Sequence, residues 1–139
     1  MAGTLSPLLK RRCTLQILIA DDNDMVRRGI ALLLSHEQEW PVCAEAANAE
    51  EVLQLAGEKR PAIVLLDVSM PGMDGLEITR RLKQQLPDTK IVIISQHDPH
   101  HLRPLALEAG AVECIDKARL ATDLLPAIRK ITAESWKTL

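Results

Sequence analysis

Apolar residues recur along the chain in five short runs, and each run is followed by a segment with a different spacing. The runs have the length of buried β-strands and cover residues 15–20, 42–46, 62–66, 90–94 and 111–115. In the segments that follow, apolar residues recur every three or four positions, as in helices with one buried face. The pattern therefore predicts five strands that alternate with five helices.

The ends of two predicted helices carry recognisable signals. Asp24 is the expected N-cap of the first helix, because acidic side chains accept hydrogen bonds from free backbone N–H groups there. The fourth helix, over residues 102–109, should end at Gly110 as a C-terminal cap. This helix contains Pro104, which must lie in the first turn or kink the helix.

The alternation of strands and helices predicts the fold class. Three of the five strands are almost uniformly apolar, as in a parallel sheet covered by helices on both faces. We therefore expect a doubly wound α/β domain. Ligands of such sheets bind outside the carboxyl ends of the strands, so the residues that end each strand are the first candidates for a site.

Composition narrows the classes of function. The chain has 139 residues, 47% of them apolar, which suits one domain with a packed core. Its net charge of −2 argues against a surface dominated by nucleic acid or membrane contacts, and it contains no Phe or Tyr for stacking on bases. Its three cysteines form no metal or disulfide motif and indicate a reducing cytoplasm. No apolar run is long enough for a membrane-spanning helix.

Polar side chains follow four of the predicted strands. They are Asp21 and Asp22 after the first, Asp67 after the third, Ser95 after the fourth and Lys117 after the fifth. Three carboxylates at one edge repel one another unless a cation lies between them. Oxygen ligands without His or Cys favour Mg²⁺, which Mn²⁺ can replace. Although His97, His100 and His101 are close in sequence, no acid or cysteine completes a zinc site.

The same residues suggest phosphoryl transfer. With a divalent ion bound, Asp67 can act as a nucleophile toward phosphorus and form an aspartyl phosphate. In this scheme Lys117 and Ser95 contact oxygens of the phosphoryl group. The turn residues Pro71, Gly72, Asp74 and Gly75 end the strand and leave Asp67 at the edge of the sheet.

These residues lie in motifs that closely resemble the receiver domain of bacterial two-component response regulators. The motifs are ADDN at residues 20–23, LLDVSMPGMDGLE at 65–77, IIS at 93–95 and EAGAVECIDKA at 108–118. The segments GLEITRRL, ISQHD and ALEAGA are similar to receivers of LuxR-type regulators. The resemblance implies a flavodoxin-like sheet with strand order 2-1-3-4-5.

The resemblance also implies a role for each site residue. Asp67 would be the phosphoacceptor, and Mg²⁺ would be held by Asp22, Asp67 and the backbone carbonyl of Ser69, with Asp21 acting through water. Ser95 and Lys117 would contact the phosphoryl group. Apart from the resemblance, we hypothesise that Ser69 and His97, which lie two residues beyond Asp67 and Ser95, flank the phosphoryl pocket together with Gln96. A sensor histidine kinase would be the phosphodonor.

The strand before Lys117 departs from the family pattern. Cys114 stands where receivers usually have the Tyr or Phe that moves with Ser95 in the switch, so the usual switch is in question. Glu113 replaces a frequent glycine. It adds charge to the face formed by the fourth helix, fifth strand and last helix, which family members use for homodimerisation or docking of a downstream protein.

Two other functions remain open. One is a pseudo-receiver that binds a protein without a phosphorylation switch. The other is a phosphatase with an aspartate nucleophile, although such enzymes typically need an acid where Ser69 stands. A receiver would catalyse only its own phosphorylation and dephosphorylation and would not be a metabolic enzyme.

The expected organisation is an N-terminal arm at residues 1–14, the receiver domain at 15–132 and a tail at 133–139. No DNA-binding domain follows the receiver in this sequence. The domain would therefore control either a partner protein or a DNA-binding output domain that is missing from the sequence.

Overall fold

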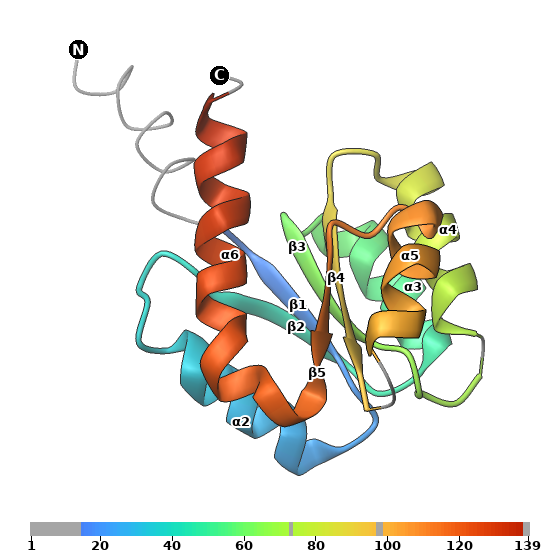
Figure 1. The fold of residues 1–139 in the computed structure, drawn as a ribbon, viewed down its shortest axis with the longest axis horizontal. Coiled ribbons are helices and arrows are strands. Elements are labelled where there is room, and N and C mark those ends of the chain that lie inside the picture. Colours follow the sequence, from blue (N-terminus) through green and yellow to red (C-terminus); the bar gives the residue numbers. More distant parts are fainter. Residues whose placement is uncertain (1–14, 73, 97–98, 138–139) are drawn as a thin grey trace.

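Five strands alternate with five α-helices in a computed structural model, which describes residues 15–72, 74–96 and 99–137 (Figure 1). The strands are β1 (Ile17–Ala20), β2 (Val42–Ala46), β3 (Ile63–Asp67), β4 (Lys90–Ser95) and β5 (Glu113–Asp116). The helices are α2 (Asp24–Leu34), α3 (Ala49–Lys59), α4 (Gly75–Gln85), α5 (Pro99–Ala109) and α6 (Leu120–Lys137), with a 3₁₀ turn η1 (Lys117–Arg119) before α6. The predicted alternation is confirmed.

The strands form one parallel sheet in the order β2-β1-β3-β4-β5. This is the flavodoxin-like order that the resemblance implies. Helices α2 and α6 cover one face of the sheet, and α3, α4 and α5 cover the other (Figure 1). Because all strands run the same way, their carboxyl ends meet at a single edge. Asp67 lies beside Ile94 in the pairing of β3 with β4, and Ser95 lies beside Asp116 in the pairing of β4 with β5.

The core is aliphatic on both faces of the sheet except for Trp40, which packs on the face covered by α2 and α6. Leu18, Val64 and Leu66 pack under α3, α4 and α5, whereas Ile19 and Leu65 pack under α2 and α6. Each of these side chains is fully buried and contributes about 1.5–3 kcal/mol relative to an exposed position. The central strands are therefore fixed by burial on both sides, which holds the residues at their ends in place.

The first helix begins differently from the prediction. Asn23, not Asp24, is the N-cap, and its side chain accepts hydrogen bonds from the backbone N–H groups of Met25 and Val26. Asp24 is the first residue of the helix. Two capping residues are adjacent here, and the one in extended conformation, Asn23, takes the cap.

The structure revises the start of the fourth predicted helix and the end of the last one, and it confirms the cap between them. Pro104 lies inside α5, past the first turn, because the helix already begins at Pro99. Gly110 follows the helix with φ at 116° and donates a hydrogen bond to the carbonyl of Leu107, so the predicted glycine cap is confirmed. Helix α6 continues to Lys137 and takes in most of the segment expected to be a tail.

The N-terminal arm at 1–14 and His97 lie outside the described residues. Within the described part of the chain, no helix combines the length and apolar character needed to cross a membrane.

Replacing Gly75 with alanine should destabilise the fold. Gly75 is buried at the start of α4, and an added Cβ would lie 2.6 Å from the Cα of Val68. Because that contact is with backbone, the segment that follows β3 must shift, and we expect a loss of about 2 kcal/mol in the free energy of unfolding.

Urea unfolding monitored by circular dichroism would measure this loss. The matched control is Gly57→Ala in the last turn of α3, where nothing lies within 4 Å of an added Cβ. That variant should gain about 0.5–1 kcal/mol from helix propensity. A Gly75→Ala protein as stable as the wild type would contradict the expected clash.

Candidate functional site at the carboxyl edge of the sheet

The structure brings the predicted charged residues together at the carboxyl edge of the sheet. Asp67 is the last residue of β3 and is completely buried, while Asp21 directly follows β1 and is also buried. Asp22 is exposed beside it. Ser95 ends β4 in a buried position, and Lys117 follows β5. Four strands thus contribute to one site, counting the residues that follow β1 and β5.

Lys117 bridges two of the acids. Its Nζ lies 3.0 Å from Oδ2 of Asp21 and donates a hydrogen bond of 3.1 Å to Oδ2 of Asp67. Burial by itself lowers the pKa of Lys117, but the two carboxylates outweigh this effect and raise its pKa above the ordinary value. The ammonium therefore stays charged and balances part of the negative charge at the edge.

Asp67 is held by its neighbour two residues on. Its Oδ1 accepts hydrogen bonds from the backbone N–H of Ser69 at 2.9 Å and from the Ser69 hydroxyl at 2.7 Å. Burial alone raises the pKa of Asp67, but the bonds from Ser69 and Lys117 outweigh it and lower the pKa below the ordinary value. Asp67 is therefore ionised at neutral pH.

Asp21 has a different balance. Its Oδ1 accepts a hydrogen bond of 2.8 Å from the backbone N–H of Asn23. Its Oδ2 is buried and has no hydrogen-bond partner, and it faces Lys117 only as an ion pair. Burial raises the pKa of Asp21 above its ordinary value, and the charge of Asp67 adds to this effect.

The three acids have the arrangement of a site for a hard cation. Oxygen atoms of Asp21, Asp22 and Asp67 lie within 4.8 Å of one another. In the described part of the chain this is the only such group of His, Cys, Asp or Glu side chains. Oδ2 of Asp21 has no hydrogen-bond partner and is held only by its ion pair with Lys117, and a carboxylate-only set suits Mg²⁺. The residues present therefore fit a magnesium ion.

A cavity of about 520 Å³ adjoins Lys117. It is lined by Val26, Gln96, Asp116, Lys117 and Ala118. Gln96, expected to flank the phosphoryl pocket, thus shares a cavity with Lys117. Ser69, the second flanking residue, contacts Asp67 directly through its hydroxyl group.

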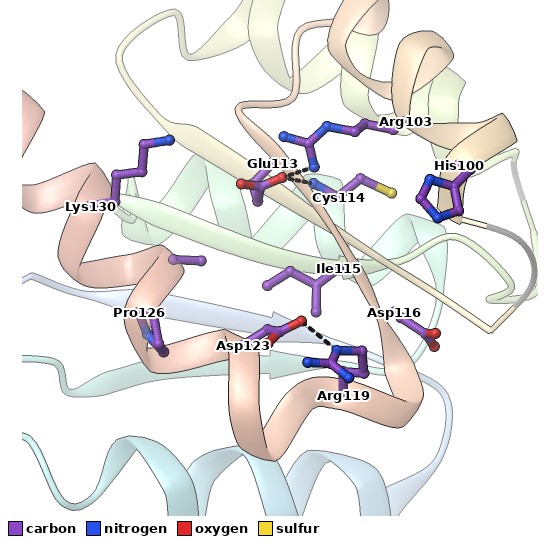
Figure 2. Close-up of a pocket in the computed structure, with 11 residues that line it drawn as sticks. His100, Arg103, Glu113, Cys114, Ile115, Asp116, Arg119, Asp123, Pro126 and Lys130 are labelled. Carbon is purple, nitrogen blue, oxygen red and sulfur yellow. Dashed lines mark hydrogen bonds and ion pairs between the residues drawn. The ribbon is translucent and has the colours of Figure 1, made fainter.

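Cys114 lies away from these charges. Its side chain is buried and packs with the core beneath α3, α4 and α5, and burial raises the pKa of its thiol. Next to it, Glu113 forms an ion pair with Arg103 of α5 and accepts a hydrogen bond from the backbone N–H of Cys114 (Figure 2). These residues belong to a groove of about 560 Å³ between α5, β5 and α6.

Arg27 was missed by sequence analysis. This residue of α2 reaches the loop that carries Asp21 and Asp22 and donates a hydrogen bond to the backbone carbonyl of Asp21. An arginine on an amphipathic helix gives no signal in the sequence, because most such residues point into solvent.

Comparisons with known proteins agree with this geometry. The family model described as "Response regulator receiver domain" matches residues 17–129. The chain is 38% identical over 117 residues to the transcriptional activator protein ExaE of Pseudomonas putida, an alignment that covers 84% of this chain and 55% of the relative. It is 37% identical over 121 residues to the response regulator GacA of Pseudomonas aeruginosa, covering 86% of this chain and 56% of the relative. The chain thus spans about half the length of these curated relatives.

Solved structures show the same likeness. A LuxR-family two-component response regulator from Aurantimonas sp. SI85-9A1 superposes with a TM-score of 0.82 at 35% identity, covering 87% of this chain and 86% of the other. The receiver domain of the putative response regulator NarL from Mycobacterium tuberculosis gives 0.79 at 29% identity, covering 86% and 97%. The predicted resemblance is confirmed, and the chain belongs to the response regulator receiver domain family.

Proposed function

We propose that this chain is a phosphoacceptor switch of a two-component system, phosphorylated on Asp67 by a sensor histidine kinase. The observation that carries the proposal is the convergence of Asp21, Asp22 and Asp67 within 4.8 Å, with the Lys117 ammonium 3.1 Å from Asp67. A buried, ionised carboxylate beside a fixed cation is suited to accept a phosphoryl group. The family and the cysteine pattern both favour action in the cytoplasm.

Each residue has a part in the proposed reaction. Asp22, Asp67 and the backbone carbonyl of Ser69 would hold Mg²⁺, with Asp21 acting through water. When bound, the ion supplies positive charge that offsets the charge of the phosphoryl oxygens. A carboxylate oxygen of Asp67 forms a bond to phosphorus as the bond between phosphorus and the donor nitrogen of a phosphohistidine breaks. Lys117 pairs with one phosphoryl oxygen and Ser95 donates a hydrogen bond to another.

The residues around the pocket would set how long the phosphoryl group lasts. Ser69, Gln96 and His97 would flank the aspartyl phosphate and limit the approach of water. The Ser69 hydroxyl donates to Oδ1 of Asp67 and therefore lies next to the group that would be modified.

The output is proposed to act through the groove between α5, β5 and α6 (Figure 2). Its walls carry the ion pairs Arg103–Glu113 and Arg119–Asp123, which suit a protein partner or a second copy of the chain. Because the curated relatives are about twice as long, we propose that residues 15–132 serve as the receiver of a longer DNA-binding regulator. The receiver itself would not contact nucleic acid.

The residue Cys114 supports one of the alternative functions, the pseudo-receiver. A small buried thiol replaces the aromatic ring of the usual switch, so a pseudo-receiver that binds a partner without switching is the second candidate. The phosphatase has no such support, because the residue two positions after Asp67 is Ser69.

Asp67→Asn should abolish phosphorylation. Incubated with MgCl₂ and acetyl phosphate, the wild-type protein should gain one phosphoryl group per chain, seen by intact-protein mass spectrometry, because only a carboxylate can form the acyl phosphate. Asp88→Asn changes the charge equally at an exposed loop position and should label like the wild type.

The same experiment separates the three functions. Label retained in Asp67→Asn would exclude Asp67 as the phosphoacceptor. Repeated turnover of phosphate esters would support the phosphatase. Labelling without change in the amide spectrum of β5 and α5 would support the pseudo-receiver.

Lys117→Met should make stability depend more strongly on magnesium. Without the ammonium, Asp21 and Asp67 are left as buried like charges, and we expect a loss on the order of 3 kcal/mol in unfolding free energy in EDTA. Because Mg²⁺ would then bind without a competing cation, MgCl₂ should restore more stability to the variant than it adds to the wild type.

Urea unfolding with and without MgCl₂ would measure both effects. Lys130→Met, an exposed position on α6, is the matched control and should behave like the wild type. Equal magnesium increments in Lys117→Met and the wild type would show that the ammonium and the metal do not share the same acids.

A further inference from the structure

The side chain of Arg27 leaves α2 and contacts the loop between β1 and α2. Its guanidinium donates a hydrogen bond to the backbone carbonyl of Asp21 and forms ion pairs with Asp24 and with Glu45 of β2, the latter at 3.1 Å. Only 14% of the side chain is exposed. One side chain thus connects the start of the helix, the acidic loop and the neighbouring strand.

The carbonyl that Arg27 binds belongs to the peptide unit that joins Asp21 to Asp22. The other groups of Asp21 are already fixed, since its backbone N–H donates to the carbonyl of Ala46 at 3.0 Å and its Oδ1 accepts from Asn23. Asp22 is exposed, and the direction of its side chain depends on how this peptide unit is rotated. Arg27 therefore holds the carbonyl of this peptide unit, which the other hydrogen bonds of Asp21 do not fix.

We propose that Arg27 is a positioning residue for metal binding, which holds the Asp21–Asp22 peptide so that both carboxylates face the same ion. This inference rests on the magnesium site of the proposed function. Mg²⁺ requires nearly octahedral geometry, so an acid that turns away costs more affinity for Mg²⁺ than for a larger, less demanding ion.

A positioning role of Arg27 and a purely electrostatic role predict opposite effects on the affinity for Mg²⁺. The positive charge of Arg27 is offset by Asp24 and Glu45, and removing it leaves these two acids uncompensated near the site. If charge alone mattered, its loss would strengthen cation binding. If Arg27 positions the loop, its loss weakens binding. The sign of the change in Mg²⁺ affinity therefore distinguishes the two.

The shape of the side chain matters as well. A guanidinium presents several N–H groups in a rigid fork and can reach a carbonyl and two carboxylates at once. Lysine keeps the charge but lacks this fork, so Arg27→Lys should restore only part of the effect.

The test is titration of ¹⁵N-labelled protein with MgCl₂ and, separately, CaCl₂, followed by the amide signals of the loop. We expect Arg27→Met to bind Mg²⁺ about 10-fold more weakly than the wild type, the lower end of the range for residues that orient metal ligands. Its affinity for Ca²⁺ should fall less, and Arg27→Lys should lie between Arg27→Met and the wild type.

The matched control is Arg28→Met, the adjacent exposed arginine, which makes no ion pair within the described part of the chain. It removes the same charge and should bind Mg²⁺ at least as well as the wild type. Urea unfolding in EDTA tests whether each variant is folded. If Arg27→Met is unfolded, the Mg²⁺ affinity of Arg27→Lys is compared with that of the wild type instead.

Unchanged or tighter Mg²⁺ binding by folded Arg27→Met would overturn the inference. An equal loss of affinity for Mg²⁺ and for Ca²⁺ would overturn it as well. A wild-type protein that binds no Mg²⁺ would instead remove the metal site of the proposed function, and the role of Arg27 with it.

Discussion

The site depends on the compensation of buried negative charge. Asp21 and Asp67 are both buried at the edge of the sheet, where their repulsion is stronger than in water. Lys117 is the cation that contacts both, and it can do so because β1, β3 and β5 are parallel and end at the same edge. One ammonium between two carboxylates, with Asp22 beside them, still leaves net negative charge. The fold therefore holds in place a site that a divalent cation would complete.

Two acids at the same edge are tuned in opposite directions. Burial raises the pKa of both when taken alone, yet Asp67 ends below its ordinary value because Ser69 donates two hydrogen bonds to one oxygen. Asp21 receives one backbone hydrogen bond and remains above its ordinary value. The acid with the lower pKa is the one that ends the central strand β3. The two neighbouring acids therefore differ in how firmly hydrogen bonds hold their charged forms.

The sequence could predict the features that depend on order along the chain. Buried strands of uniform apolar character, and the polar residue that ends each, follow from local pattern, and Asp21, Asp22, Asp67 and Lys117 do meet at one edge. The sequence could not predict features that depend on competition between neighbouring residues or on contacts between secondary-structure elements. Asn23 and Asp24 are both good caps, and only the backbone conformation decides between them. The start of α5 at Pro99 leaves Pro104 inside the helix. Arg27 reaches Asp21 and Glu45 only because β2 lies beside β1.

The route from the site to the groove between α5, β5 and α6 is short. Ser95 is paired with Asp116, the residue before Lys117, so groups that would contact a phosphoryl oxygen lie at the ends of adjacent strands. Movement of Lys117 would act on β5 through the main chain, because Lys117 directly follows this strand. Cys114 is too small to act as a rotating ring, but Glu113, one residue earlier, is tied to Arg103 of α5. In this chain, movement of β5 would therefore reach α5 through an ion pair, which unlike a buried ring is exposed to solvent and to the charges of a docked partner.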